Sequence, residues 1–482
     1  MKANTKTTGV NMTTNKCGNP AYVMKDKEKL VTMVLTSFFN EAKFYGDNSA
    51  ELVELADKLV ANGNAEFVSN LAVFARREMN MRTISHVLTT RLAKSEQGRA
   101  YVCGTIKGVS LRGDDLTEIM AMFLDGIDSD KKTIPNQMKK GMSDVLNGMN
   151  EYHLAKYKGE KNAIKMADVI KLCHPHSSSK QHELYKRCIE GKLAVPYTWE
   201  TELSTKGNTK EVWEQLINSG KVGYMALLRN LRNILNVGVS HECLAKVLAT
   251  ISNEDNVVNS KQLPFRYLSA YKVVSDIAGS EVFGALENAI KASFKNLPKV
   301  SGTTVIAIDV SGSMSDTLSS KSTIQYVEVA YLMGMILSNI CDNTIVYTFD
   351  HRLNKLAVPH DCDVLHWVTS RGANGGWTEM ALPLQEMVAK GIKADRIVYL
   401  SDNECNWGKT TIQSHADEYR RKVNHDFWVH AIDMAGYGTQ QFIGDKFNLL
   451  AGWSEKVLQF ISLAELGVDN LIKTIEEYNY FT

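Results

Sequence analysis

The sequence predicts an α-helical repeat region followed by an α/β region with a parallel sheet, and three observations support this prediction. From about residue 27 to residue 295, apolar residues recur at helical spacing almost throughout. After the segment 297–302 the period changes, and strand-like runs alternate with helical ones. The first strand-like run ends in Asp309-x-Ser311-x-Ser313, a short loop rich in side-chain oxygens.

The helical region begins with three segments whose apolar residues fall on one face. These residues are Leu30, Met33 and Val34, then Leu52, Leu55, Ala56, Leu59 and Val60, then Phe67, Leu71, Phe74 and Ala75. Further amphipathic segments cover about 83–94, 97–107, 115–126, 135–155, 162–173, 210–218, 223–236, 240–252, 262–277 and 281–296. Helices of this length joined by short polar turns predict antiparallel pairs that stack into a HEAT-like solenoid.

In the α/β region, strand-like runs alternate with helical segments. The expected strands are 305–310, 344–349, 396–401 and 427–432, and the expected helices are 322–340, 379–390, 411–424, 440–450 and 463–478. This alternation predicts a doubly wound parallel sheet with helices on both faces. Ligands of such sheets bind at the carboxyl ends of the strands. Asp309 and Asp402 both follow a predicted strand at that end.

The composition is that of a globular protein with two or three domains, because 44% of the 482 residues are hydrophobic and 23% are charged. We predict a flexible N-terminus over 1–22, a helical domain over 23–298 and an α/β domain over 299–482. The first residues do not form a secretory signal, and no apolar run is long enough to cross a membrane. Eight scattered cysteines without a C-x-x-C pair indicate free thiols and a cytoplasmic protein.

Charge is unevenly distributed along the chain. Residues 301–482 carry 14 Lys and Arg against 22 Asp and Glu, whereas residues 1–300 carry 41 against 32. Residues 131–187, called the basic segment below, contain 12 Lys and Arg against 5 Asp and Glu. Such asymmetry is typical of chains that bind a polyanion through their basic part. The alternative is that each part is simply a solvated globule.

Three loops at predicted strand ends or helix starts supply oxygen ligands. Asp309, Ser311 and Ser313 follow one strand, Asp402 follows another, and Thr378 lies between two glycines and a helix. Carboxylates and hydroxyls suit Mg²⁺, which takes few protein ligands and keeps several waters. The pattern resembles the metal-ion-dependent adhesion site of von Willebrand factor A domains. We therefore predict a divalent-metal site, with Mg²⁺ as the expected ion and Mn²⁺ and Ca²⁺ left open. Its free coordination position would take a carboxylate or phosphate of a partner.

Two enzymatic interpretations of the same loops are weaker. A phosphotransferase of the Asp-x-Asp type would lack its second carboxylate, because position 311 is serine. A serine hydrolase would lack its G-x-S-x-G elbow. Taken singly, the first loop is also a common turn, and Asp402-Asn403-Glu404 is a common helix cap. The order of the three loops favours a metal site that binds and does not catalyse.

The chain resembles the Ro autoantigen ribonucleoproteins, in which a TROVE domain precedes a von Willebrand factor A-like domain. The matching strings are 168–175 (DVIKLCHP), 226–231 (ALLRNL), 263–267 (LPFRY), 305–311 (VIAIDVS) and 378–383 (TEMALP). The resemblance spans about residues 20–480. One departure concerns the metal loop, where the family commonly places Thr directly after the glycines and an Asp next. Here Trp377 precedes Thr378 and Glu379 follows, which leaves the shape of this loop open.

The resemblance implies a ring of HEAT-like helices closed by the A domain. It implies that small noncoding, Y-like RNA binds a basic outer face, and that single-stranded 3′ ends of misfolded RNA enter a central hole. It also implies a link to an exoribonuclease such as polynucleotide phosphorylase. The residues that we assign to RNA binding are Lys139, Lys140, Lys156, Lys158, Lys161, Lys165, His174, Arg229 and Arg232.

The leading hypothesis is a monomeric, non-enzymatic RNA-binding protein that serves as scaffold or quality-control factor for noncoding RNA. Lysines act as point charges, so shape and single-strandedness should dominate over base sequence in recognition. One alternative is a metal-dependent protein-adhesion adaptor without RNA, and another is a cryptic metal-dependent hydrolase of phosphate esters. The sequence does not name the RNA or the group that completes the metal shell.

Overall fold

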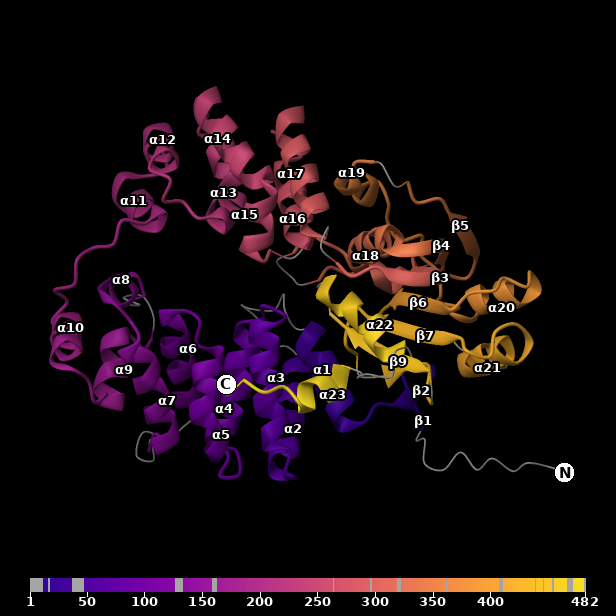
Figure 1. Ribbon diagram of the computed structural model, residues 1–482, viewed down its shortest axis with the longest axis horizontal. Coiled ribbons are helices and arrows are strands. Elements are labelled where there is room, and N and C mark those ends of the chain that lie inside the picture. Colours follow the sequence, from indigo (N-terminus) through magenta and orange to yellow (C-terminus); the bar gives the residue numbers. More distant parts are fainter. Residues whose placement is uncertain are drawn as a thin grey trace. The chain divides into compact units, whose positions relative to one another are not determined.

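The computed structural model in Figure 1 divides into two compact units. Unit 1 contains Met1–Phe39 and Asn208–Leu471, and unit 2 contains Asn40–Gly207 and Ile472–Thr482. The domain boundaries that we predicted after residues 22 and 298 were drawn from the sequence pattern, whereas the two units are defined by contacts. These domain boundaries stay predictions. The residues that the structure describes are 12–15, 18–36, 47–125, 133–157, 163–262, 264–294, 297–318, 322–359, 362–406, 411–437, 439–444, 446–452, 455–465 and 471–480.

Unit 2 is a stack of helices. They are α2 (Asp47–Ala61), α3 (Ala65–Arg77), α4 (Thr83–Lys94), α5 (Arg99–Val109), α6 (Gly113–Leu124), α7 (Asn136–Asn147), α8 (Glu151–Lys156), α9 (Met166–Cys173), α10 (Ser179–Ile189) and α11 (Trp199–Lys206). Helix α3 packs on α5, α5 on α7 and α7 on α9, while α2 packs on α4, α4 on α6 and α6 on α8. Two rows of alternate helices are the arrangement of HEAT-like repeats, which confirms the predicted helical repeat fold.

Unit 1 combines helices with a sheet. Its helices before the sheet are α1 (Asp26–Thr36), α12 (Lys210–Asn218), α13 (Tyr224–Asn236), α14 (His241–Ser252), α15 (Glu254–Ser260), α16 (Pro264–Val274) and α17 (Ser280–Ser293). Helix α13 packs on α14 and α16, and α17 packs on α14, α15 and α16. The apolar faces predicted from the sequence are buried in these contacts, for example at Leu231, Ile234, Val247 and Ile251.

The main sheet of unit 1 has six strands in the order β5-β4-β3-β6-β7-β9. They are β3 (Val300–Asp309), β4 (Cys341–Phe349), β5 (Leu353–Leu356), β6 (Arg396–Ser401), β7 (Trp428–Asp433) and β9 (Phe447–Ala451). All neighbours are parallel except the β4–β5 pair. Val305 to Asp309 of β3 are fully buried, which explains the unbroken apolar run of a central parallel strand. The α/β region therefore has the predicted doubly wound fold.

Helices connect these strands, and an apolar core lies against them. The connecting helices are α18 (Tyr326–Ile340), α19 (Val364–Thr369), α20 (Ala381–Ala389) and α21 (Ile412–Lys422). Side chains of α20, α21 and the sheet form one core cluster that includes Leu384, Met387, Tyr399, Tyr419 and Phe427. The Tyr419 hydroxyl donates to Ile392 O (2.7 Å) and accepts from Ala394 N (2.8 Å), so it satisfies the backbone just before β6.

Several element predictions were wrong in ways that tertiary contacts explain. The predicted helix 440–450 is instead the short strand β8 (Thr439–Gln440) and the strand β9, which pairs with β7. The predicted helix 463–478 is two short helices, α22 (Gln459–Glu465) and α23 (Leu471–Glu476). The predicted helix 135–155 is broken at Gly148, because Asn150 caps a new helix by accepting from His153 N. Helices α10, α11, α15 and α19 and strand β5 were missed.

The N-terminal segment is also more ordered than predicted. Strands β1 (Met12–Thr14) and β2 (Pro20–Val23) pair with each other, and β2 pairs with β8 in a three-stranded sheet. The Asn15 side chain donates to Cys405 O at 3.0 Å, which ties this segment to the loop after β6. A polar composition predicted loose chain here, but residues 12–15 and 18–23 are held by the pairing of β1 with β2 and by hydrogen bonds to residues after β6.

Two side-chain contacts join the helical part of unit 1 to its sheet part. Lys272 of α16 lies 2.8 Å from both carboxylate oxygens of Glu328 on α18. Glu287 of α17 accepts from Leu365 N (2.9 Å) and His366 N (3.2 Å), so it caps the start of α19 from another helix. Burial raises the pKa of Glu287 to about 7, against the backbone donors that favour its charged form.

Within the described residues, no helix is long and apolar enough to cross a membrane. Seven cysteines (103, 173, 188, 243, 341, 362 and 405) lie in the described part of the chain, and all are free thiols. The prediction of free cysteines therefore holds for these seven.

The raised pKa of Glu287 predicts a pH dependence of stability. A carboxyl whose pKa is higher in the folded than in the unfolded state stabilises the fold below pH 4–5 and loses this contribution as pH rises through about 7. Glu287→Gln keeps an acceptor oxygen without the charge. We expect its melting temperature relative to the parent protein to rise between pH 5 and pH 8. Asp255→Asn, an exposed position on the neighbouring helix α15, should show a constant difference, and parallel curves for both variants would contradict the assignment.

Candidate functional site

The sheet brings two of the three predicted metal loops to one edge. Strand β3 lies between β4 and β6. Later strands are added first on one side of β3 and then on its other side, so the strand order changes direction at β3. Ile308 pairs with Leu400 in parallel register, and the next residues, Asp309 and Ser401, therefore end side by side. This is the topological switch point at which open α/β sheets bind ligands.

Short hydrogen bonds fix the side chains at this edge. Asp309 accepts from Ser401 Oγ at 2.6 Å and from Ser311 N at 2.9 Å, so each of its oxygens has a donor. Ser311 Oγ and Ser313 Oγ lie 3.4 Å apart, and the Ser313 hydroxyl bonds the Asp402 carboxylate. Asp309, Ser311, Ser313 and Asp402 thus meet in one cluster, as the sequence predicted.

Burial makes the charged form of the carboxylates in this cluster costly. Asp309 and Asp402 are both inaccessible to solvent, and burial together with their mutual repulsion raises the pKa of Asp309. Burial also raises the pKa of Asp402, against the hydrogen bond from Ser313. A third carboxylate, Asp433 at the end of β7, is equally buried, and burial raises its pKa to about 7. Buried carboxylates are costly unless they are neutralised by protons, cations or metal ions.

The donor set fits a hard divalent cation. Asp402 Oδ2 is buried and has no hydrogen-bond partner among the described residues. Two serine hydroxyls lie beside it, and all of these donors are oxygens. No group of three or more His, Cys, Asp or Glu in the described ranges forms a conventional metal cluster. A metal here would therefore depend on hydroxyls and one or two carboxylates, which is a donor set suited to Mg²⁺ with retained waters.

The third loop reaches the same place through two glycines. Gly375 and Gly376 have φ of +81° and +92°, which glycine adopts without strain. Gly376 O accepts from Gly312 N at 3.2 Å, so this loop lies against the first one. Thr378 N donates to Asn406 Oδ1 (3.2 Å) and Thr378 O accepts from Asn406 N (2.8 Å). The Thr378 side chain is only 3% exposed.

Trp377 does not occupy the cluster. Its side chain is 58% exposed, and its ring packs against the His351 ring at a tilt of 39°, with centroids 4.8 Å apart. A side chain at position 376 would meet His351 Nδ1 at 2.6 Å, so Gly376 leaves the room that this ring contact needs. The extra residue in the loop is therefore directed outward, while Thr378 keeps a buried position.

Sequence reasoning missed three residues of the site. Ser401 bonds Asp309, Asp433 adds a buried carboxylate, and Asn406 fixes Thr378 through its backbone. Ser401 was visible as the last residue of a predicted strand. Asp433 lies one residue beyond the predicted end of its strand, and nothing in the local sequence marks Asn406.

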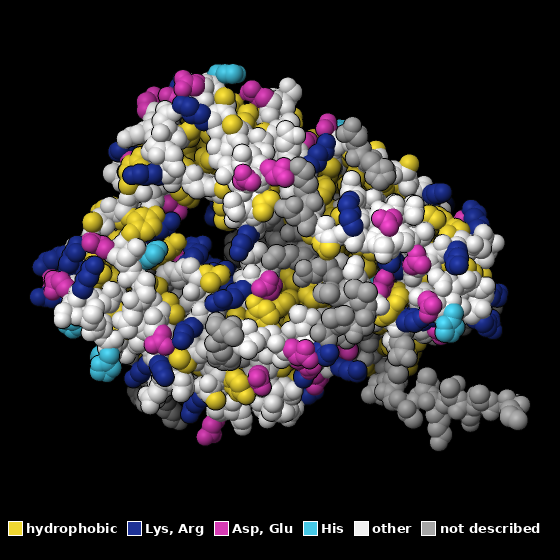
Figure 2. All heavy atoms as spheres, viewed as in Figure 1, with side chains coloured by type: hydrophobic (Ala, Val, Ile, Leu, Met, Phe, Trp, Pro, Cys, Tyr) yellow, Lys and Arg dark blue, Asp and Glu magenta, His cyan; other side chains and the backbone are white. Residues whose placement is uncertain are grey.

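The basic segment covers α7 to α10 of unit 2. Lys139 and Lys140 lie on α7, Lys156 ends α8, and Lys165 and His174 flank α9. His174 ends this helix with φ of +46°, a left-handed cap. Figure 2 shows Lys and Arg side chains gathered over α10 and the segment that follows it. Lys158 and Lys161 were also predicted to bind RNA, but they lie outside the described residues.

The described lysines of the basic segment form no ion pair with other described residues. Among the described residues, ion pairs bind Arg187 to Glu151 and, just beyond the segment, Lys192 to Glu190. Those without an ion pair to another described residue are Lys139, Lys140, Lys156, Lys165, Lys171, Lys180 and Lys186. Lys156 instead lies over the rings of Tyr152 (5.7 Å) and Tyr157 (5.5 Å). Positive charge is therefore left for an external anion.

Arg229 and Arg232 are exposed on α13 of unit 1. Neither forms an ion pair within the described ranges, so neither links neighbouring helices through a salt bridge. Because these two arginines are three residues apart, their side chains lie on the same face of the helix. Their assignment to RNA binding stays a prediction.

Helical repeats joined to an α/β sheet with hydroxyl and carboxylate loops at its switch point define a repeat protein with a von Willebrand factor A-type domain. The family model of the TROVE domain matches residues 13–191 and 186–284 of this chain. The family model of the Ro60 vWA domain matches residues 303–448. The chain therefore belongs to the TROVE family, and the resemblance inferred from sequence strings is confirmed.

Individual relatives are distant. Telomerase protein component 1 of Mus musculus is 24% identical in an alignment of 310 residues that covers 47% of this chain and 12% of that protein. RNA-binding protein RO60 of Caenorhabditis elegans is 26% identical in an alignment of 251 residues that covers 48% of this chain and 38% of that protein. The chain thus matches well under two thirds of the length of these relatives.

A solved structure shares the fold. The crystal structure of the Deinococcus radiodurans RO (RSR) protein aligns with a TM-score of 0.64 and 16% identity. The alignment covers 92% of this chain and 100% of that one. At this identity the likeness supports the fold and nothing finer.

The glycine pair of the third loop gives a stability prediction. Gly376→Ala places a side chain at positive φ and against His351, and we expect it to lower the free energy of unfolding by about 1–3 kcal/mol. Gly372→Ala lies in the same segment, meets no atom within 4 Å and should change stability by less than about 0.5 kcal/mol. Urea denaturation of both variants measures this, and equal losses would show that the loop does not depend on Gly376.

Proposed function

We propose that this chain binds RNA through the basic segment, as a non-enzymatic scaffold or quality-control factor. The observation that carries the proposal is a set of exposed lysines on α7, α9 and α10 that form no ion pair with another described residue, in a member of the TROVE family. The match to a relative named RNA-binding protein RO60 supports it. Unpaired lysines bind phosphates by releasing counterions, so the affinity would depend steeply on salt.

The finer parts of the proposal follow from the family resemblance. The RNA would be a small noncoding, Y-like RNA, and single-stranded 3′ ends of misfolded RNA would form a second class of ligand. Arg229 and Arg232 would contact such single strands. An exoribonuclease would be the protein partner, and the chain would act as a monomer in the cytoplasm. Helical repeats offer extended surfaces of this kind, because each repeat exposes similar positions along the stack.

We also propose that the cluster at the sheet edge binds a divalent metal, with Mg²⁺ preferred. Ser311, Ser313 and Thr378 would bind it through hydroxyls, and Asp402 through the oxygen that has no other partner. Asp309 would orient Ser311 and hold a metal-bound water. When bound, the ion would offer a free position to a carboxylate or phosphate. Neutralisation of the buried carboxylates is the physical reason that supports this site.

The RNA proposal predicts a change in salt dependence. Lys140, Lys171 and Lys180 lie exposed on α7, α9 and α10, and replacing all three with Gln removes three phosphate contacts. We expect weaker binding and a slope of log K against log salt that is shallower by about 2–3. Fluorescence anisotropy measures the affinity and the slope, with a labelled RNA hairpin that carries a single-stranded 3′ tail and KCl varied from about 50 to about 200 mM.

A matched control removes three lysines that already have partners. Lys206, Lys246 and Lys422 pair with Glu202, Glu242 and Glu418 four residues earlier on their helices. Their replacement with Gln changes net charge equally and should leave the slope unchanged. If both triple variants lose RNA affinity equally, the effect comes from net charge alone. That result would overturn the assignment of RNA binding to the basic segment.

The metal proposal predicts that Mg²⁺ raises the melting temperature of the parent protein. A ligand that binds only the folded state stabilises it by about 2.7 kcal/mol when its concentration is about 100-fold above Kd. Asp402→Ala and Asp309→Ala should abolish this Mg²⁺-dependent shift, whatever their effect on stability without metal. Asp426→Ala, an exposed carboxylate of the same domain, should retain the shift. A full shift in Asp402→Ala would show that the ion binds elsewhere.

A further inference from the structure

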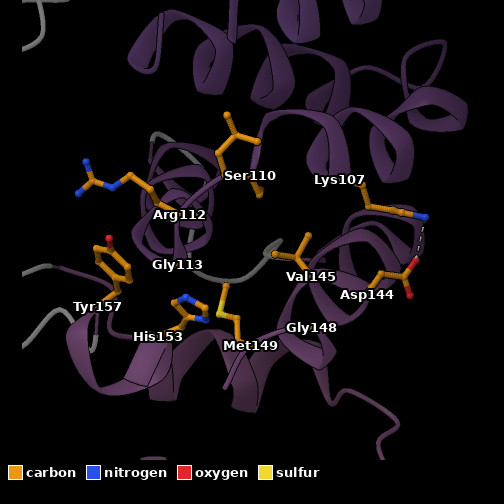
Figure 3. Close-up of a pocket in the computed structure, with 11 residues that line it drawn as sticks. Lys107, Ser110, Arg112, Gly113, Asp144, Val145, Gly148, Met149, His153 and Tyr157 are labelled. Carbon is orange, nitrogen blue, oxygen red and sulfur yellow. Dashed lines mark ion pairs between the residues drawn. The ribbon is translucent and has the colours of Figure 1, made fainter. Parts of the chain in front are cut away.

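Unit 2 contains a surface pocket of about 440 Å³, and none of the predicted RNA-binding residues lines it. Figure 3 shows it between the loop that joins α5 to α6 and the region of α7 and α8. Residues 110–113 form one wall, and Met149, His153 and Tyr157 form the other. Its volume is in the range of small-ligand pockets, which is about 300–1,000 Å³.

The loop wall is held in place by charged side chains of α3 and α6. Arg76 Nε donates to Val109 O at 3.0 Å, and Arg77 Nε donates to Gly108 O at 2.9 Å. The fully buried Asp115 accepts from Leu111 N (2.9 Å) and Arg112 N (2.8 Å). A wall that is fixed before binding loses little conformational entropy when a ligand arrives.

The opposite wall presents aromatic rings. Figure 3 shows His153 and Tyr157 rising from α8 toward the loop. A side chain at Gly113 would meet Tyr157 Cδ2 at 2.9 Å, so only glycine lets the loop approach this ring. The Arg112 guanidinium lies 5.3 Å from the ring centroid. Together with the buried Met149, these groups form a surface suited to a flat ring.

The polar groups of the pocket are nearly neutral as a set. Lys107 Nζ lies 3.7 Å from Asp144 Oδ2, and Arg112 donates to both oxygens of Asp114 at 3.0 and 2.8 Å. A bare phosphate would have to displace one of these carboxylates. Ser110 Oγ is buried without a hydrogen-bond partner in the described part of the chain, which points to a polar atom of a ligand.

We propose that this pocket binds the base of one unstacked nucleotide of single-stranded RNA. The ring would lie against Tyr157 and His153, and its polar edge would face Ser110 and Asp144. The inference rests on the proposed RNA binding, because the helices that line the pocket also carry lysines of the basic segment. Lys140 lies one turn before Asp144 on α7, and Lys156 precedes Tyr157. Neighbouring phosphates would meet these lysines while the base enters the pocket.

The first test uses mononucleotides and the full-length chain. Calorimetric titration with AMP, GMP, CMP and UMP should detect binding, and ribose 5-phosphate should not bind under the same conditions. The comparison isolates the base, because both kinds of ligand carry the same sugar and phosphate. Binding of ribose 5-phosphate as tightly as of the nucleotides would overturn the proposal, and so would the absence of binding by all four nucleotides.

The second test changes the aromatic wall. Tyr157→Ala should weaken binding of a single-stranded oligonucleotide about 5- to 150-fold, the range expected for loss of one base–aromatic stack. Its salt slope should stay unchanged, because no charge is removed. Tyr157→Phe should keep most of the affinity. Tyr152→Ala is the matched control, since Tyr152 lies exposed on the same helix, also beneath Lys156, but does not line the pocket.

A third variant covers the case in which Tyr157→Ala impairs folding. Ser110→Ala removes the unpartnered hydroxyl without changing a packed ring, and it should weaken mononucleotide binding while circular dichroism stays that of the parent. Equal oligonucleotide losses in Tyr157→Ala and Tyr152→Ala would overturn the pocket and leave the basic segment in place. If the parent binds no RNA at all, the proposed function fails, whereas the mononucleotide titration still decides the pocket.

Discussion

The site of this protein depends on the parallel register between β3 and β6. That register places Asp309 beside Ser401, and their 2.6 Å hydrogen bond joins the first loop to the end of the neighbouring strand. The Ser311 and Ser313 hydroxyls and the Asp402 carboxylate then follow from loop geometry, since each lies within a few residues of these strand ends. A slip of one residue would turn every side chain of β3 to the other face of the sheet and would separate this cluster.

The two functional regions use charge in opposite ways. At the sheet edge, negative charge is buried and short of donors, so it favours a cation of high charge density. Along α7 to α10, positive charge is exposed and short of carboxylates, so it favours a long anion. The pocket beside α8 differs from both, because its cations are paired and its walls are aromatic. A protein that reads RNA by shape would use the exposed lysines for affinity and such a pocket for the recognition of unstacked bases.

Much of the fold could be predicted from sequence, and the failures share one cause. Long amphipathic helices and the four central strands have strong periodicity, so their existence followed from the pattern alone. The strand Phe447–Ala451 was predicted as helix because five largely apolar residues fit either period, and its pairing with β7 decided the outcome. Pro20–Val23 was predicted as loose chain, although it pairs with Met12–Thr14 nearby and with Thr439–Gln440, more than 400 residues away. Local pattern contains no information on such partners.

The candidate site divides in the same way. The sequence by itself determined the family, the two fold types, the oxygen-rich loops around Asp309 and Asp402, and the position of the basic segment, because these depend on residue type and spacing. Only the tertiary structure decided that Trp377 packs against His351 while Thr378 is buried, that Asp433 adds a third carboxylate, and that Ser110 and Tyr157 line one pocket. The physical reason is that burial and pairing are properties of segments brought together by folding. A hydroxyl or carboxylate acquires its chemistry from neighbours that lie far from it in the chain.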